Sequence, residues 1–463
     1  MKKMISNMEQ VGIGEKFAYS LGDFASNLIF ALACSLITYF YTNTVGISAA
    51  AAGSVLMFSQ IFDGITDVLI GFLIDRTRSK YGKARPWLLW MAVPFGIACI
   101  LLVCVPRNAS MVVKIVYAFI TYNLVMTVCY TAINVPYGAL NTLMTRDQYQ
   151  RSVINIWRMT MAMLATMVVT AVTLPIINGL GGDQAAWIKT MVIYATLAVA
   201  MFLICFKCTR ERVTEELGPQ KQVPVKTALK AVFKNNYWLL LIGVWLLYAV
   251  NTTFSGTTTV YYAQYILGNE TLMGPINIAL NLPAVIGIPF MAPLIKKFGK
   301  KPLAIAGCVI TLCGCLLMMI QPENLTMVVA STLVKGIGTV PFWAVLYAMM
   351  ADTVEYGEWK TGVRTEGLLY SASTFGAKAG AGIGSAIVGA ILTANMFDGM
   401  LEVQPQSAVS AISAMYLFVP IVMVVLQIVC LSFYKLDKEY PQIMAELKIR
   451  EAKARNKQEE VEV

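Results

Sequence analysis

Long apolar runs separated by short polar loops dominate the pattern along the chain. A helix that crosses the hydrocarbon core of a membrane needs about 20 mostly apolar residues, and twelve runs meet this requirement. They are 18–42, 49–74, 86–105, 111–140, 153–180, 185–206, 237–266, 272–295, 302–320, 325–351, 367–396 and 408–434. These runs lack the short alternating strands of a membrane barrel. The pattern therefore predicts an all-α integral membrane protein with twelve transmembrane helices.

One polar stretch, 207–236, is longer than the other loops and divides the runs into two sets of six. We therefore expect an N-terminal six-helix bundle (1–206), a cytoplasmic connector (207–236), a C-terminal six-helix bundle (237–434) and a charged cytoplasmic tail (435–463). A weak repeat between the loops around 71–86 and 292–302 supports two related halves. Two pseudo-symmetric six-helix bundles with a substrate site near the midplane are typical of major facilitator transporters.

The charged residues are distributed unevenly between the loops on the two sides of the predicted spans. The chain is 57% apolar and 13% charged, and its formal net charge is +10, whereas a soluble protein carries about 25% charged residues. Twenty lysines and arginines lie in the loops on one side of the predicted spans, against three on the other side (Arg107, Lys114 and Lys189). The positive-inside rule then predicts a multi-pass protein of a bacterial-type inner membrane with both termini in the cytoplasm. The positive charge thus indicates a lipid bilayer and not a nucleic acid partner.

Several functional classes lack the residues they require. The chain contains no histidine, which excludes a Ser-His-Asp triad and a His-ligated metal site. It has no Walker A sequence to bind ATP. We therefore expect no enzyme activity, no cofactor and no metal beyond a bound Na⁺.

The second apolar run contains acidic residues at membrane depth, where a charge costs at least about 2.5–3.5 kcal/mol on insertion scales. Asp63, Thr66 and Asp67 occupy positions i, i+3 and i+4 near the midplane and share one helix face. Two such carboxylates stay ionised only with a cation between them, or else one holds a proton. The spacing predicts a Na⁺ or H⁺ site. The alternative is neutralisation by a basic residue on another helix.

Further polar side chains occur inside other runs. They are Asp23 and Asn27 in the first run, Thr131 and Asn134 in the fourth, Arg158 in the fifth, Lys335 in the tenth, and Thr374 and Lys378 in the eleventh. Lys378 is about eleven residues deep and has little room to snorkel, so we expect it to face a cavity. Asn134 can instead serve a kink at Pro136, and Arg158 and Lys335 can snorkel. The glycines at 376–384 favour close helix contact over a phosphate loop.

Several segments together resemble the glycoside–pentoside–hexuronide:cation symporters, the family of the melibiose permease and the glucuronide transporter. The matches are Tyr19-Ser-Leu-Gly22-Asp23, Asp63-Gly-Ile-Thr66-Asp67, Asp75-Arg76-Thr-Arg78-Ser-Lys80-Tyr-Gly82-Lys83-Ala-Arg85-Pro86-Trp87, Asn134-Val-Pro136-Tyr137, and Phe342-Trp343 ahead of Asp352-Thr353-Val-Glu355-Tyr356-Gly357-Glu358-Trp359. They occur in the order that the family has and cover nearly the whole chain.

The resemblance implies two sets of binding residues. The cation site falls on Asp63, Thr66, Asp67 and Thr131. The sugar site falls on Asn27, Asn134, Arg158, Trp343, Thr374 and Lys378, to which we add Asp23, one turn from Asn27, and Lys335 as a weaker candidate. An aromatic face such as that of Trp343 can stack on the apolar face of a sugar ring.

Two departures bear on the substrate. Asn27 and Asn134 stand where the melibiose pattern has aspartates, and Gly138 replaces a tryptophan. The glucuronide-type members are therefore more similar. Asp63 and Asp67 supply two negative charges, against the positive charges of Arg158, Lys378 and, as a weaker candidate, Lys335, and a bound cation makes the sum more positive. This count favours an anionic sugar such as a hexuronide. Asp23 weakens this argument if it faces the same cavity.

We therefore expect a secondary symporter that imports a sugar or glycoside, such as a hexuronide, glucuronide or pentoside, with Na⁺ or H⁺. Five residues near the loops after the second and tenth runs are expected to form a cytoplasmic gate: Asp75, Arg76, Arg85, Asp352 and Glu355. Ordinary solvated loop charges are the alternative for them. A carrier of a lipid or another non-sugar solute on the same fold, and a membrane sensor that does not transport, are the rival functions.

Overall fold

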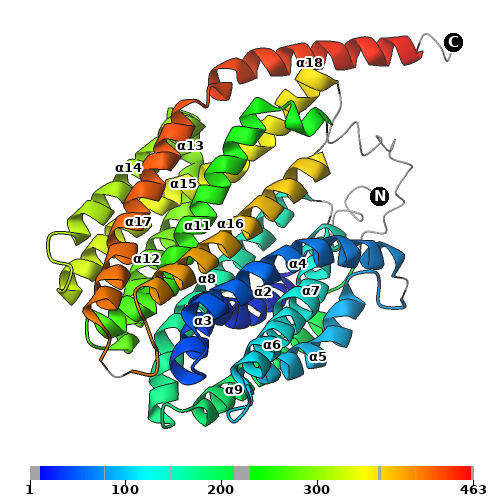
Figure 1. The fold of residues 1–463 in the computed structure, drawn as a ribbon. Helices are drawn as coiled ribbons and strands as arrows, with labels where there is room; N and C mark the ends of the chain where they lie inside the picture. Colours follow the sequence, from blue (N-terminus) through cyan, green and yellow to red (C-terminus); the bar gives the residue numbers. More distant parts are fainter. Residues whose placement is uncertain are drawn as a thin grey trace. The chain divides into compact units, whose positions relative to one another are not determined.

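The fold of this chain is described by a computed structural model (Figure 1). It describes residues 11–212 and 230–459, apart from 78, 146, 363–365 and 402, and every regular element within these ranges is a helix. The side chains of a further group, which includes Asp67, Asp75 and Arg76, lie outside the described set.

All twelve predicted apolar runs are helical. The first six correspond to α2 (Ile13–Ser35) with α3 (Ile37–Tyr39) and η1 (Phe40–Thr44), α4 (Ala49–Arg76), α5 (Arg85–Val103), α6 (Met111–Tyr122) with η2 (Asn123–Tyr130) and α7 (Thr131–Met144), α8 (Gln148–Gly179) and α9 (Gln184–Cys208). The second six correspond to α11 (Asn236–Tyr265), then α12 (Met273–Gly287) with η4 (Ile288–Phe290) and α13 (Met291–Phe298), α14 (Lys300–Met318), α15 (Leu325–Thr361), α16 (Glu366–Ala394) and α17 (Gln406–Ser432). The short η3 (Glu270–Leu272) precedes α12, and α18 (Leu436–Glu459) forms the tail.

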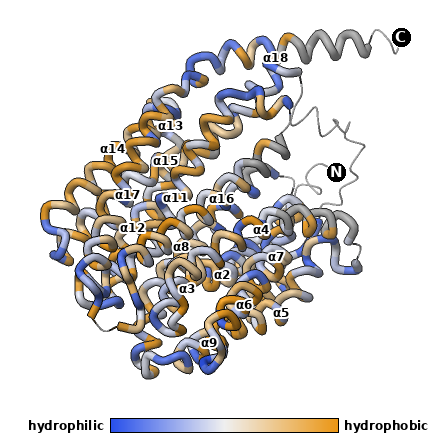
Figure 2. Tube along the Cα trace, in the orientation of Figure 1, coloured by the Kyte–Doolittle hydropathy of each residue, from blue (hydrophilic) through white to orange (hydrophobic). Residues whose placement is uncertain are grey.

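These helices have the length and composition of membrane spans. Among the described residues, ten helices are long and apolar enough to cross a bilayer. The two remaining predicted runs are α4, which has several side chains outside the described set, and the stretch from α12 to α13, which the short η4 interrupts. Figure 2 shows apolar residues along most helices and hydrophilic residues at many helix ends and along α18.

The chain forms two compact units. Unit 1 contains residues 1–217, 252–281 and 381–416, and unit 2 contains residues 218–251, 282–380 and 417–463. In unit 1, α2 packs against α8 and α9, and α4 packs against η2 and α7. In unit 2, α14 packs on α15, and the core gathers around Trp238, Leu346 and Tyr434. The division into bundles 1–206 and 237–434 remains a prediction.

Glycines of α16 allow close helix packing, as the sequence predicted. A Cβ atom added at Gly380 would lie 2.9 Å from the carbonyl oxygen of Leu246 in unit 2. One added at Gly382 would lie 3.3 Å from the backbone of Met57 in unit 1. At Gly380 the neighbouring backbone is too near for a side chain, and at Gly382 a side chain would fit only if its neighbours shifted by a few tenths of an ångström.

Candidate functional site

A buried ion pair joins α2 to α8 in unit 1. The Nε of Arg158 donates to Oδ2 of Asp23 over 2.6 Å, and a second guanidinium nitrogen lies 3.4 Å from Oδ1. The side chains are 17% and 9% exposed, respectively. An unpaired charge at this depth would be costly, so the pair neutralises both groups. Arg158 therefore does not snorkel to the surface, which was the alternative for it.

Two tyrosines enclose this pair. Tyr19 and Tyr137 stack with ring centroids 4.5 Å apart, and each hydroxyl donates to the other residue's backbone carbonyl over 2.7 Å. The guanidinium carbon of Arg158 lies 4.7 Å from the centre of the Tyr137 ring. Gly22 leaves room for that ring, because a Cβ there would come within 2.5 Å of it. The Gly22-Asp23 motif thus places the carboxylate beside the aromatic pair.

The two asparagines near this pair differ in their hydrogen bonding. The side-chain nitrogen of Asn27 donates to the backbone carbonyl of Asp23 over 2.8 Å, within the same helix. The side-chain oxygen of Asn134 is buried and has no hydrogen-bond partner among the described residues. One turn further on, a Cβ atom at Gly138 would meet no described atom within 4 Å. Asn134 is thus a buried acceptor one turn from a position with room for a side chain.

The acidic face of α4 meets α7. Thr131, which is 2% exposed, donates its hydroxyl to Oδ1 of Asp63 over 3.1 Å. The Thr66 hydroxyl donates instead to the backbone carbonyl of Asp63 over 3.0 Å, so its oxygen keeps lone pairs that can accept. Three of the four predicted cation ligands are thus gathered at one place, and the side chain of Asp67 lies outside the described set.

Among the described residues, no group of three or more histidine, cysteine, aspartate or glutamate side chains could hold a metal ion. The side chains described at Asp63 are one carboxylate with the hydroxyl oxygens of Thr66 and Thr131 beside it.

The predicted sugar residues of the second half belong to unit 2. The Trp343 indole nitrogen donates to the Tyr248 hydroxyl, and Tyr248 stacks on Phe342 with centroids 5.3 Å apart. Trp343 also meets Trp245 edge to face at 5.8 Å. This aromatic cluster fixes the orientation of the Trp343 ring, which a stacking platform for a sugar requires.

The cationic residues of unit 2 differ in exposure. Lys378 on α16 is half-buried, and Thr374, one turn earlier, is exposed. Lys335 is only 7% exposed, and its stem packs on α14, where a Cβ at Gly314 would lie 2.7 Å from the Lys335 Cγ. Lys335 therefore lies within helix packing.

Two of the described gate candidates, Arg85 and Asp352, have hydrogen-bond partners in their own units. The Arg85 guanidinium donates to the carbonyl of Phe206 over 2.7 Å, and its backbone N–H donates to Glu211. Asp352 pairs with Lys300 at 2.6 Å. One carboxylate oxygen of Glu355 is buried without a described hydrogen-bond partner. The predictions for Asp75 and Arg76 concern side chains outside the described set.

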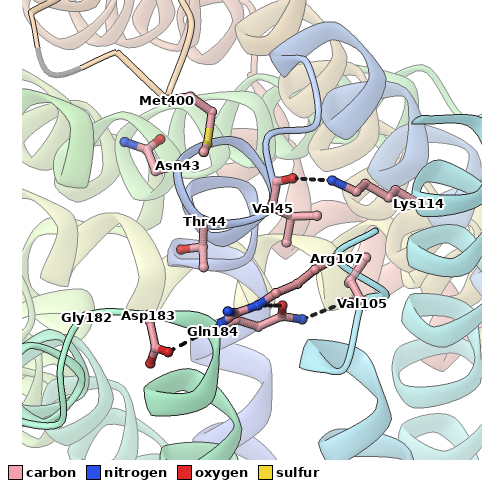
Figure 3. A pocket seen from close by; sticks show the side chains of 10 residues that line it. All are labelled: Asn43, Thr44, Val45, Val105, Arg107, Lys114, Gly182, Asp183, Gln184 and Met400. Carbon is pink, nitrogen blue, oxygen red and sulfur yellow. Dashed lines mark hydrogen bonds and ion pairs between the residues drawn. The ribbon is translucent and has the colours of Figure 1, made fainter. Parts of the chain in front are cut away.

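A pocket of about 410 Å³ lies elsewhere in unit 1 (Figure 3). Arg107 donates to Gln184 over 2.8 Å, and Lys114 donates to the backbone carbonyl of Val45 over 3.1 Å. The backbone N–H of Ala186, with a further effect of Arg107, lowers the pKa of Asp183, which caps α9. None of the predicted binding residues lines this pocket.

Some site residues were missed from the sequence. Tyr248 supports Trp343 from α11, and Asn123 of η2 donates to Ser59 over 2.8 Å, one turn before Asp63. Ser59 and Asn123 are polar residues inside long apolar runs, so the pattern that singled out Asp63 could have found them as well.

Comparisons with known proteins agree with this architecture. A sequence profile described as MFS/sugar transport protein matches residues 18–438. The isoprimeverose transporter of Lactiplantibacillus pentosus is 34% identical over 95% of this chain and 92% of its own length. The glucuronide carrier protein homolog of Escherichia coli (strain K12) is 30% identical over 93% and 94%, respectively. The crystal structure of the nucleoside transporter NupG aligns with a TM-score of 0.62 at 15% identity, covering 91% of this chain and 100% of that one.

Proposed function

Since the chain belongs to the MFS/sugar transport family, a family of membrane transporters and not of enzymes, we propose that it is a symporter that imports a sugar or glycoside with Na⁺ or H⁺. The observation that carries this proposal is the Asp63 carboxylate, held by the Thr131 hydroxyl between two apolar helices. Relatives named as an isoprimeverose transporter and a glucuronide carrier support a sugar as the substrate.

The cation binds, in this proposal, at Asp63 and Asp67 with Thr66 and Thr131 as oxygen ligands. The Thr66 hydroxyl already donates to its own helix, so its oxygen faces a cation without rearrangement. The Thr131 hydroxyl rotates from donating to Asp63 to sharing the ion with it. If the coupling ion is H⁺, protonated Asp63 donates to the Thr131 oxygen instead.

The sugar binds at residues of both halves. Asn134 offers a buried acceptor one turn from the free space at Gly138, Asn27 and Asp23 lie one turn apart on α2, and Trp343 stacks on the ring. Lys378, Thr374 and the second edge of Arg158 bind hydroxyls or a carboxylate. Lys335, packed on α14, is the weakest candidate in this set.

The location and the gate complete the proposal. The protein lies in the inner membrane with both termini in the cytoplasm, because the loop cations follow the positive-inside rule. Asp75, Arg76, Arg85, Asp352 and Glu355 act near the cytoplasmic ends of the spans. The division of the chain into the bundles 1–206 and 237–434 is part of the same proposal.

Uptake into membrane vesicles tests the proposal. A labelled glucuronide and a neutral pentoside are each offered with a Na⁺ gradient or a pH step. Uptake that requires one gradient and is lost in Asp63→Asn, but not in the matched surface control Asp183→Asn, supports the cation site. If neither gradient drives uptake of either sugar, the sugar symporter assignment fails, and transport of a non-sugar solute or a sensor role takes its place.

A further inference from the structure

A second polar cluster lies one turn from the proposed cation site in unit 1. It consists of Ser59 on α4 and of Asn123 and Thr127 on η2. Ser59 and Thr127 are 1% and 2% exposed. None of the three belongs to the cation or sugar residues described above. Buried polar groups within a transmembrane helix are costly unless they are bonded, so their presence requires a reason.

The cluster forms a continuous hydrogen-bonded chain. The side-chain nitrogen of Asn123 donates to Oγ of Ser59 over 2.8 Å and to the carbonyl of Phe119 over 2.8 Å. The Thr127 hydroxyl donates to Oδ1 of Asn123 over 3.1 Å. Ser59 in turn donates to the carbonyl of Val55 over 2.7 Å. The Asn123 amide therefore has its donors and its acceptor engaged, and it links η2 to α4 through one inter-helix bond.

The placement of this bond relative to the π-helical segment is informative. The π-helix η2 begins at Asn123, and Thr131 follows its last residue. Asn123 bonds to Ser59, and Thr131 bonds to Asp63, one turn further along α4. The side chains of Asn123 and Thr131, at the two ends of η2, thus bond to successive turns of α4. π-Helical segments are rare and occur frequently at functional sites, because their wide turns redirect the residues that follow.

We propose that Asn123, through its bond to Ser59, is a positioning residue for the coupling ion: it fixes the register of η2 against α4 and so holds the Thr131 hydroxyl at Asp63. This inference rests on the proposed cation symport. Asn123 does not touch the ion. When the bond to Ser59 is lost, η2 can relax toward α-helical turns, which rotates Thr131 away from Asp63 and weakens ion binding.

Three variants test this role. Asn123→Leu keeps the side-chain size, Ser59→Ala removes the accepting atom alone, and Ser59→Thr keeps a hydroxyl. The matched control is Thr190→Val, because Thr190 is 1% exposed on α9 and its hydroxyl donates only to its own helix at Ala186. The readouts are the ion concentration at half-maximal uptake and the KM for sugar at saturating ion.

We expect Asn123→Leu and Ser59→Ala each to raise the half-saturating ion concentration about fivefold, as the loss of one neutral hydrogen bond allows. The double variant should shift the half-saturating ion concentration by less than the two single shifts combined, because both substitutions remove the bond between Asn123 and Ser59. Each substitution also removes bonds within its own helix, from Ser59 to Val55 or from Asn123 to Phe119 and Thr127. Ser59→Thr and Thr190→Val should stay near the unmodified protein. In Asn123→Leu and Ser59→Ala the sugar KM should change less than the half-saturating ion concentration.

Equal shifts in ion dependence and sugar KM, or no shift in either variant, would overturn the positioning role while ion-driven uptake by the unmodified protein stands. If the unmodified protein shows no ion dependence, the proposed function and this inference fail together. Should Asn123→Leu fail to fold, Ser59→Ala decides the question, because it deletes only one oxygen atom.

Discussion

The pair between Asp23 and Arg158 gives the sharpest prediction, and its perturbation is Asp23→Asn. This change keeps the shape of the side chain and removes its charge. The two groups lie 2.6 Å apart and are 9% and 17% exposed, so solvent screens them weakly. The guanidinium would then remain as a buried charge without a carboxylate.

The magnitude follows from three contributions. Removal of one member of a buried pair costs about 3–5 kcal/mol. The amide oxygen that this substitution introduces can still accept one N–H, and the Tyr137 ring, 4.7 Å from the guanidinium, retains a cation–π contact worth about 1–2 kcal/mol. We therefore expect a net loss of about 2 kcal/mol. At about 2–4 °C per kcal/mol for larger chains, the melting temperature should fall by about 4–8 °C.

A thiol-reactive fluorescent dye provides the assay, because Cys205 is fully buried beside Tyr19 and becomes accessible on unfolding. The detergent-purified protein is heated without sugar so that substrate binding does not contribute. A double-mutant cycle with Arg158→Gln isolates the pair: the double variant should be more stable than the summed single effects by at least about 1 kcal/mol. Asp183→Asn, whose partner Arg107 is exposed, serves as the control.

The reasoning is refuted if Asp23→Asn has the same melting temperature as the unmodified protein. It is also refuted if the stability changes of the two single variants add up to that of the double variant. Either result would mean that the two charges are solvated or bound to other groups, and that Arg158 does not depend on Asp23 for neutralisation.

Three further predictions concern other contacts. Gly22→Ala should lower the melting temperature by several degrees, because its Cβ would come within 2.5 Å of the Tyr137 ring; Gly138→Ala, with no described atom within 4 Å, should not. Lys300→Ala should destabilise the protein by about 1–3 kcal/mol, measured by chemical or thermal denaturation, because it leaves the 6% exposed Asp352 side chain without its ammonium partner. Lys297→Ala, at the exposed end of α13, is the control and should have a smaller effect. The pKa of Asp183 is lowered by the Ala186 N–H in the folded protein, so its stabilising effect is complete above about pH 4 and is lost as the pH falls through the folded pKa. The melting temperature of the unmodified protein should therefore drop more than that of Asp183→Asn between about pH 5 and 3, and parallel curves would contradict this account.

The apolar pattern was sufficient to predict the helices but not their interruptions. All twelve runs are helical because each buries its backbone polar groups internally, as a membrane requires. The π-helical segments at Phe40–Thr44 and Asn123–Tyr130 were not predicted. The second segment begins at Asn123, which bonds to Ser59 on α4, and hydropathy does not record such inter-helix contacts. Similarly, α15 continues about ten residues past its predicted end at 351 and stops at Gly362, whose φ of 71° suits a helix end.

The proposed cation site was partly predictable because Asp63 and Thr66 lie on one helix, where spacing fixes their geometry. Thr131 stood out as a polar residue of the fourth run, but its role beside Asp63 came from the family resemblance, and the structure places its hydroxyl on Asp63. The direction of the Thr66 hydroxyl, toward its own backbone, follows from local hydrogen bonding that spacing does not determine.

The pairing of Asp23 with Arg158 changes the argument about substrate charge. Counted from the sequence, Arg158 and Lys378 together favoured an anionic sugar. The structure commits the Arg158 charge to Asp23 across 135 residues of chain, a contact that no local pattern could reveal. A neutral pair still offers directional N–H donors, and these suit sugar hydroxyls as well as a carboxylate. The preference for a hexuronide over a neutral pentoside then depends on Lys378. A Lys378→Gln variant should therefore lose glucuronide uptake far more than pentoside uptake, and equal losses would show that the charge of the sugar is recognised elsewhere.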